Sequence, residues 1–478
     1  MTGKFFKFKS SQFFFCILLG LLLTSCTRTR NRSRSNQLDC VNKPEIAEVT
    51  SSNPFENVSI DIGIDGSGSM VGFVSRSGTL YTQAIDSLST LIGNRNIATR
   101  YWRIGSSLET DTTQAQAITT AQFLEAKFPQ FYDCKVTGSD YPCVSSTLHQ
   151  IYELDGSADS NEDPVAQTED AAIDEVVDSE KVVKILITDL EPNQSAIAEL
   201  SSRVSQELQK NQDYKAVLVG VRSEFNGNVF SAETGQVVIG DYSTDDTNVT
   251  ESGRPFYLVM TGPEKALDEI INSFNNLPLD VSEAFRVTSF ASSDIDVITL
   301  DKTSVPDPVN ECTIQRGNIG RQRPPKEQAN QWLILEQRGC QGETETVVDV
   351  WSEPSTSLLG ATISPEKLVS SNPILNVEAV NVQGDRLNVQ TRINAGEGSR
   401  RGETAYLTLS QRDLDEAVWA DWNSTAANPN GAKTQNLLLF VYGLREAVKG
   451  MALQNTDPDT GTVRVPSDDA VKFCIGIN

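Results

Sequence analysis

The feature that most constrains the fold is a regular alternation of buried-strand and helical patterns between residues 57 and 274. Strand-like apolar runs occupy residues 57–65, 98–106, 182–190, 214–223 and 254–262. Helical spacing of apolar residues occupies 79–93, 146–154, 195–211 and 264–274. Strands that are apolar throughout are usually covered on both faces by the helices that connect them. The alternation therefore predicts an α/β fold with a doubly wound, mostly parallel sheet flanked by helices.

After about residue 280 the apolar period changes from helical spacing to two. Short alternating segments separated by turn-rich stretches predict a β-rich C-terminal domain over 281–478, similar to a β-sandwich. Gly384 is expected in the turn of a hairpin within it, and a helix is expected over 434–450. Trp419 and Trp422 precede that helix. We expect them in the core, with the lining of a pocket as the alternative.

The first 26 residues have a basic start followed by an apolar run, which is the pattern of a secretion signal. The run is shorter than the ~20 residues that a membrane-spanning helix needs. It closes on Leu-Thr-Ser-Cys26, which resembles the bacterial lipoprotein signal, in which cleavage precedes a lipid-bearing cysteine. We expect residues 1–25 to be removed, Cys26 to carry lipid, and the Arg- and Ser-rich stretch 26–54 to tether an exported protein to the bacterial cell envelope. Ordinary secretion with a coincidental cysteine is the alternative.

Composition restricts the partners. The formal net charge is −24, and loss of the signal's three lysines takes it to −27. Binding of nucleic acid requires a basic face, so a nucleic-acid partner is not expected. The 478 residues, 38 % of them apolar, allow two to three domains with real cores. Residues 155–180 are acidic and poor in aromatics, and we expect them to form a mobile loop of the first domain, 55–280.

An even number of cysteines remains after the signal and the lipidated position are set aside. They are Cys40, Cys134, Cys143, Cys312, Cys340 and Cys474. In an exported protein this number favours disulfides, and the short spacings favour the local pairs 134 with 143 and 312 with 340. The remaining two would join the chain ends. A zinc site is disfavoured because no CxxC occurs and the chain has one histidine.

Side-chain oxygens follow the first strand at alternate positions, on Asp65, Ser67 and Ser69. Ligands of doubly wound sheets bind beyond the carboxyl ends of the strands, and Gly66 and Gly68 permit a tight loop there. A carboxylate with two hydroxyls is a hard-oxygen set suited to Mg²⁺ or Mn²⁺. In the alternative without a metal, the aspartate caps a helix and the serines only build a turn.

Residues 65–69 read DGSGS and resemble the DxSxS pattern of the von Willebrand factor A (vWA) domain, which forms a metal-ion-dependent adhesion site. That family has a second metal-linked aspartate after a later strand, usually within TDG. Here Asp189 stands at that position, with Leu190 where glycine is usual. The resemblance covers roughly residues 55 to 280 and implies the family's strand order for that region.

The same resemblance implies a hydroxyl ligand at the start of a middle helix. Ser146 fits best by its spacing to the apolar residues that follow, and Ser145 and Thr147 are close rivals. Family behaviour implies that the hydroxyls coordinate the ion directly, whereas the two aspartates act largely through water. The ion then keeps an open position for an acidic group of a partner.

These features predict an envelope lipoprotein that binds a divalent cation and, through it, an Asp or Glu carboxylate of a protein partner. No small-molecule substrate is identified and no catalysis is expected, because His149 falls within a predicted helix. One alternative is an inactive structural scaffold. Another is a nucleotide-dependent enzyme, since residues 60–69 also resemble, more faintly, the phosphate loops of actin-like ATPases and sugar kinases.

Overall fold

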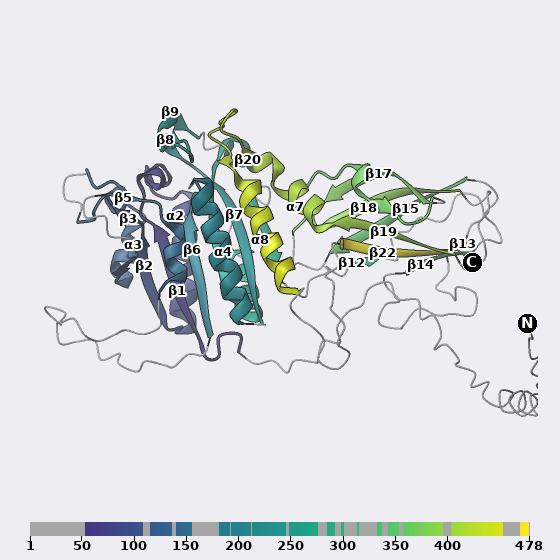
Figure 1. The fold of residues 1–478 in the computed structure, drawn as a ribbon, viewed down its shortest axis with the longest axis horizontal. Helices are drawn as coiled ribbons and strands as arrows, with labels where there is room; N and C mark the ends of the chain where they lie inside the picture. The colour runs from purple at the N-terminus through teal and green to yellow at the C-terminus, as the bar shows by residue number, and fades with distance from the viewer. Residues whose placement is uncertain are drawn as a thin grey trace, which may run out of the picture.

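The computed structural model describes residues 53–108, 115–135, 140–154, 181–191, 193–211, 213–244, 248–275, 284–291, 298–300, 313–314, 332–336, 343–352, 357–373, 375–394, 403–452 and 469–477 (Figure 1). The signal, Cys26, the tether up to residue 52 and the acidic segment 155–180 lie outside these residues. So do Cys40, Cys312 and Cys340 and the side chain of Cys474. No helix of the described part is both long and apolar enough to cross a membrane.

A seven-stranded sheet forms the centre of the N-terminal part of the protein. In spatial order its strands are β11 (Phe285–Phe290), β7 (Tyr214–Ser223), β10 (Arg254–Pro263), β6 (Lys181–Thr188), β1 (Val58–Asp65), β2 (Thr99–Ile104) and β4 (Gln116–Ile118). The pairs β6–β1 and β1–β2 are parallel, and the other four pairs are antiparallel. The expected α/β architecture is present, but the sheet is mixed rather than mostly parallel.

The antiparallel strand β10 accounts for much of this difference. It lies between β6 and β7 and opposes both. A parallel neighbour needs a crossover, usually a helix, whereas β7 and β10 are joined by a hairpin and one helical turn, so the chain returns in the opposite direction. The hairpin strands are β8 (Asn226–Phe230) and β9 (Val237–Ser243), and the turn is α5 (Val249–Ser252). Strand β11, expected in the C-terminal domain, instead pairs with β7.

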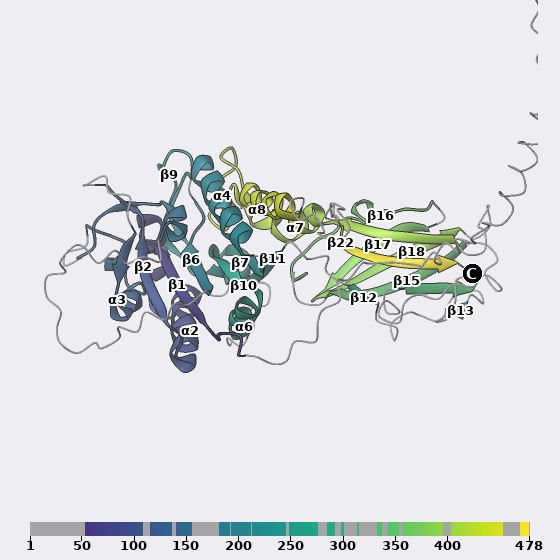
Figure 2. The ribbon, with the colours of Figure 1, turned by 60° about the horizontal axis from the view of Figure 1, so that its bottom comes forward.

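Helices cover both faces of this sheet (Figures 1 and 2). One core contains residues of α2 (Leu80–Arg95) and α6 (Glu264–Asn275), and the other contains residues of α4 (Gln194–Lys210) and α8 (Leu437–Ala452). Helix α2 begins where the Thr79 side chain accepts from Thr82 N, and α4 begins where Asn193 accepts from Ala196 N. Such caps satisfy backbone N–H groups that a helix start leaves unpaired. All four helices were predicted, with boundaries close to those observed.

The expected helix over 146–154 is a shorter 3-10 helix, η3 (Leu148–Tyr152). It packs against the middle of β1, where Gly63 leaves room. A Cβ at Gly63 would stand 2.8 Å from both Ile151 Cδ1 and Ile104 Cγ1. The short strand that precedes it, Val144–Ser145, pairs with Ser106–Ser107, and the helix begins two residues later than its apolar spacing indicated.

Two further sheets lie beside the first part in Figure 1. One has the strands β12 (Ile298–Leu300), β15 (Glu343–Ser352), β18 (Arg386–Asn394) and β17 (Leu375–Gln383); the other has β13 (Thr313–Ile314), β14 (Trp332–Glu336), β22 (Asp469–Ile477), β19 (Glu403–Ser410) and β16 (Val369–Ser370). Strands β17 and β18 form the predicted hairpin, and Gly384 occupies its turn with φ +60°. A positive φ is the backbone conformation that favours glycine.

Short elements complete the described structure. They are η1 (Gly68–Val74), β3 (Ser106–Ser107), α3 (Thr120–Glu125), η2 (Pro129–Phe131), β5 (Val144–Ser145), η7 (Pro365–Lys367), α7 (Gln411–Trp419), η8 (Ala420–Trp422), β20 (Asn423–Ser424) and β21 (Thr434–Gln435). Trp419 and Trp422 are fully buried, with ring centroids 5.7 Å apart, and Trp419 Nε1 donates to Thr288 Oγ1 at 2.9 Å. The prediction that these tryptophans belong to the core is confirmed.

Candidate metal centre

Asp65 connects three segments of the candidate site. It ends β1 and is completely buried. Its Oδ1 accepts from the backbone N–H of Ser67 at 3.0 Å, and its Oδ2 accepts from Ser146 Oγ at 2.9 Å and from Thr188 Oγ1 at 3.0 Å. The carboxylate therefore holds together its own loop, the segment before η3 and the end of β6.

The two loop serines present their hydroxyls to each other. Ser67 Oγ and Ser69 Oγ are 3.1 Å apart. Neighbouring ligands of an octahedral Mg²⁺, each about 2.1 Å from the ion, lie about 3.0 Å apart, so this spacing suits two adjacent ligand positions. Ser67 precedes η1, but its side chain makes no capping hydrogen bond there.

Among the three rival hydroxyls of the middle segment, Ser146 is the one that reaches Asp65. Ser145 is exposed and lies opposite Ser106 in the pair of strands β3 and β5. The hydroxyl of Thr147 also turns toward Ser106, with its Oγ1 2.7 Å from Ser106 Oγ. The geometry therefore brings Ser146 into the cluster and leaves the other two outside it.

Asp189 follows the end of β6 and is 2 % exposed. Its Oδ1 accepts from Glu191 N at 3.4 Å, whereas its Oδ2 is buried and has no hydrogen-bond partner among the described residues. A buried carboxylate oxygen without a partner is costly. The Arg254 guanidinium approaches this oxygen only to 3.8 Å. A cation in direct contact would satisfy it, so the residues present fit a hard divalent ion.

Leu190, which stands where the vWA pattern usually has glycine, adopts a left-handed backbone with φ +52°. Its N–H donates to Thr188 Oγ1 at 3.1 Å, and its side chain is 2 % exposed within the core on the α4 face. Burial of the side chain and this hydrogen bond together offset the cost of the conformation.

A buried arginine beside the cluster was not anticipated from the sequence. Arg254, at the start of β10, is 1 % exposed, and its Nη2 lies 2.6 Å from Glu191 Oε2 and 3.8 Å from Asp189 Oδ2. The contact with Glu191 is an ion pair. Burial raises the pKa of Glu191 to about 7, although the charge of Arg254 acts in the opposite direction. No motif links residues so far apart in the chain, so the sequence carries no signal of this pair.

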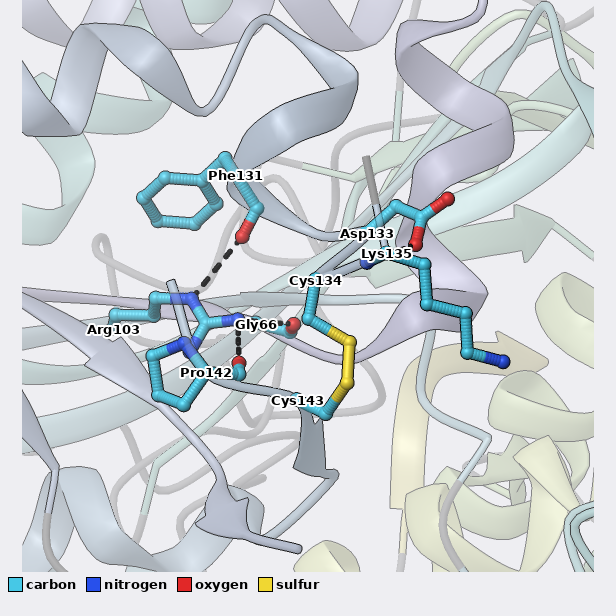
Figure 3. Close-up of a disulfide and its surroundings, with 8 residues drawn as sticks. All are labelled: Gly66, Arg103, Phe131, Asp133, Cys134, Lys135, Pro142 and Cys143. Carbon is cyan, nitrogen blue, oxygen red and sulfur yellow. Dashed lines mark hydrogen bonds between the residues drawn. A yellow bond between two sulfur atoms is a disulfide. The ribbon is translucent and has the colours of Figure 1, made fainter. Parts of the chain in front are cut away.

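A second buried arginine ties the loop that follows β1 to a disulfide (Figure 3). Arg103 Nη2 donates to the carbonyls of Gly66 and Pro142, each at 3.0 Å. A Cβ at Gly66 would stand 2.7 Å from Arg103 Nε, so this close approach requires glycine. Cys143, the neighbour of Pro142, is joined to Cys134 in the expected disulfide, with the Cα atoms 5.0 Å apart.

The buried carboxylates of the site make the stability of the fold depend on pH. Burial, and then the charge of Asp189, raise the pKa of Asp65 from 3.8 to about 6. Without a divalent cation, the folded protein therefore holds this proton to higher pH than the unfolded chain. The free energy of unfolding should then fall as pH rises from about 4 to about 6, by roughly 2 to 3 kcal/mol from this carboxyl. Urea denaturation in EDTA at several pH values across this range measures the free energy of unfolding. For Asp65→Asn this free energy should change less with pH than for the wild type. An equal pH dependence in the two proteins would contradict a raised pKa at Asp65.

Comparisons with known proteins give no identification. A scan against protein-family models, a search of curated proteins and a search of solved structures each found no match.

Proposed function

We propose that this chain is an envelope lipoprotein whose N-terminal α/β part is a vWA domain that binds Mg²⁺ or Mn²⁺ and, through the ion, an Asp or Glu carboxylate of a protein partner. The observation that carries the proposal is the convergence of five oxygen-bearing side chains at the carboxyl ends of β1 and β6. These are Asp65, Ser67, Ser69, Ser146 and Asp189. One of their buried oxygens, Asp189 Oδ2, lacks a hydrogen-bond partner among the described residues and lies 3.8 Å from Arg254 Nη2.

The roles of the residues follow from their charges. The hydroxyls of Ser67, Ser69 and Ser146 would hold the ion directly, with Asp65 and Asp189 behind them. Hydroxyl ligands add no formal charge, so an ion held in this way keeps most of its positive field. The ion's part would be to attract an acidic group that the acidic protein would otherwise repel.

The fold supports this proposal in part. Three adjacent strands, β6, β1 and β2, run parallel and end where the candidate ligands lie, as expected for ligand sites in such sheets. The antiparallel insertion of β10 departs from the expected arrangement, and it brings Arg254 to the site. An inactive scaffold lacks divalent-ion binding, and an actin-like or kinase-type enzyme binds nucleotide, so direct titration with Mg²⁺ and with ATP separates these alternatives.

Mg²⁺ should stabilise the folded protein. At an ion concentration ten times the dissociation constant, binding contributes about 1.4 kcal/mol, which raises the melting midpoint by roughly 2 to 4 °C. Asp65→Ala should abolish the rise while leaving the protein folded, because it also removes the repulsion between two buried carboxylates. Calorimetric unfolding in EDTA and in millimolar Mg²⁺ or Mn²⁺ measures both effects. Equal wild-type midpoints, with no ion bound in titration, would favour the inactive scaffold.

Partner binding should depend on the ion and on the cluster together. A bait of the mature chain is incubated with envelope extract in Mg²⁺ and in EDTA, beside baits carrying Asp65→Ala and the exposed control Glu251→Gln. A protein retained in Mg²⁺ by the wild type and the control, and lost in EDTA and with Asp65→Ala, is the expected partner. Replacing the carboxylates on its contact surface should then abolish binding. Retention that ignores both EDTA and Asp65→Ala would refute the cation-bridged interaction.

The anchor is tested separately from the site. Cys26→Ser should yield an uncleaved precursor or release the protein from membranes, because each buried CH₂ of the lipid contributes about 0.8 kcal/mol to membrane binding. Membrane fractionation and intact mass measure the two outcomes. A processed variant that stays on the membrane like wild type would show that another anchor is responsible.

A further inference from the structure

A second group of metal-ligating side chains lies between η3 and α4, separate from the candidate metal centre. His149, the one histidine of the chain, belongs to η3, Glu153 directly follows η3, and Glu199 belongs to α4. One potential ligand atom from each residue lies within 4.8 Å of the others. His149 Nε2 is 3.5 Å from Glu199 Oε1 and 4.0 Å from Glu153 Oε2.

We propose that His149, Glu153 and Glu199 form a second cation site, selective for a transition-metal ion such as Zn²⁺. Ligands about 2.1 Å from a tetrahedral ion lie about 3.4 Å apart. The observed separations of 3.5 and 4.0 Å therefore need only small side-chain movements. An imidazole with carboxylates suits Zn²⁺, whereas the all-oxygen cluster at Asp65 suits Mg²⁺. This site goes beyond the proposed function and does not rest on it.

The surroundings provide both rigidity and access. The His149 side chain is 15 % exposed and is held on η3, which packs against β1. The side chains of Glu153 and Glu199 are 39 % and 46 % exposed, so an ion reaches them from solvent and water completes its coordination. Zinc was disfavoured from the sequence because no CxxC occurs and the chain has one histidine. Packing between η3 and α4 brings two carboxylates to that histidine, which neither feature of the sequence indicates.

Arg203 is the cation that this cluster holds in the structure. Its Nη2 lies 2.5 Å from Glu153 Oε1 and 3.9 Å from Glu199 Oε1. A metal ion must displace this guanidinium, which is 35 % exposed and has room to turn outward. Arg203 therefore competes with the ion, and its removal should strengthen metal binding.

Binding of Co²⁺ to the full mature chain tests the proposal through the visible absorption of the bound ion. Excess Mg²⁺ is present to saturate oxygen-only sites. We expect one Co²⁺ per chain, displaced by Zn²⁺. His149→Gln should weaken binding by more than about tenfold, because the only nitrogen ligand is lost. Arg203→Met should strengthen it by about tenfold, which corresponds to about 1.4 kcal/mol. Glu251→Gln, on an exposed surface elsewhere, should leave it unchanged.

Three outcomes would overturn this assignment. They are no bound Co²⁺ in the wild type, equal affinity in wild type and His149→Gln, and binding to Arg203→Met no tighter than to wild type. Glu199→Gln provides an independent test if the histidine variant fails to fold, and it should also weaken binding. The Co²⁺ titration in excess Mg²⁺ reports on His149, Glu153 and Glu199, whereas the Mg²⁺ titration reports on the cluster at Asp65. Failure of one site is therefore distinguishable from failure of the other.

Discussion

Arg254→Met is expected to lower the free energy of unfolding by about 3 to 5 kcal/mol, because it leaves buried carboxylates without their cation. Arg254 is 1 % exposed and approaches both Glu191 and Asp189. Its Nη1 also donates to the carbonyl of Gly431 at 3.2 Å, so the variant loses a contact between β10 and the segment before α8. Urea denaturation in EDTA, followed by circular dichroism, measures the loss.

A second substitution separates charge from packing. Glu191→Gln combined with Arg254→Met should recover much of the lost stability, since it removes the charge left unpaired. The matched control is Arg76→Met. Arg76 is 42 % exposed and lies 3.3 Å from Glu224, so its loss should cost less than about 1 kcal/mol. If the Arg254 variant is no less stable than this control, the buried ion pair does not stabilise the fold.

Trp419→Ala should lower the free energy of unfolding by a similar amount, about 3 to 5 kcal/mol, because it opens a large cavity in a closed core. The indole is fully buried, its ring centroid lies 6.2 Å from that of Tyr257, and its N–H has a partner on β11. Trp419 belongs to α7, whereas Tyr257 belongs to the central sheet. The substitution therefore tests whether the C-terminal helices and that sheet share one core.

Leu439→Ala is the control for this prediction. Leu439 lies on α8 and is 47 % exposed, so its truncation should change the stability by less than about 0.5 kcal/mol. Trp419→Phe should fall between the two variants, because it keeps part of the ring volume but loses the indole N–H. A Trp419→Ala protein that unfolds at the same urea concentration as the Leu439 variant would contradict a shared core.

Local patterns in the sequence predicted most of the elements of the first part, but not how some of them pair. The apolar runs identified β1, β2, β6, β7 and β10, and helical spacing identified α2, α4 and α6. The direction of β10 could not be predicted from the sequence, because a strand buried on both faces has the same apolar pattern whether its neighbours are parallel or antiparallel. For the same reason the sequence did not predict that β11 pairs with β7.

In the candidate site, too, the residues that are recognisable from short sequence patterns were predicted, and those defined by contacts between distant parts of the chain were not. Asp65, Ser67 and Ser69 are recognisable because they are close in sequence, and Asp189 because it follows an apolar strand. Ser146 was already favoured by its apolar spacing. The structure separates it from its two rivals, because Ser145 and Thr147 both lie against Ser106 whereas Ser146 reaches Asp65. The arginines at 103 and 254 were missed because each contacts carbonyls or carboxylates far away in the chain.

The turn at Leu190 shows how a residue other than glycine meets a demanding backbone geometry. The turn requires a left-handed backbone, which glycine adopts freely and other residues adopt at a cost of about 1 to 2 kcal/mol. Leucine meets the requirement here because its side chain is buried in the core and its N–H is bonded to Thr188. Glycine and an anchored leucine are thus two solutions to one geometric demand. At this turn the conformation is therefore set by the backbone and its hydrogen bond, and the side chain decides only how the cost is met.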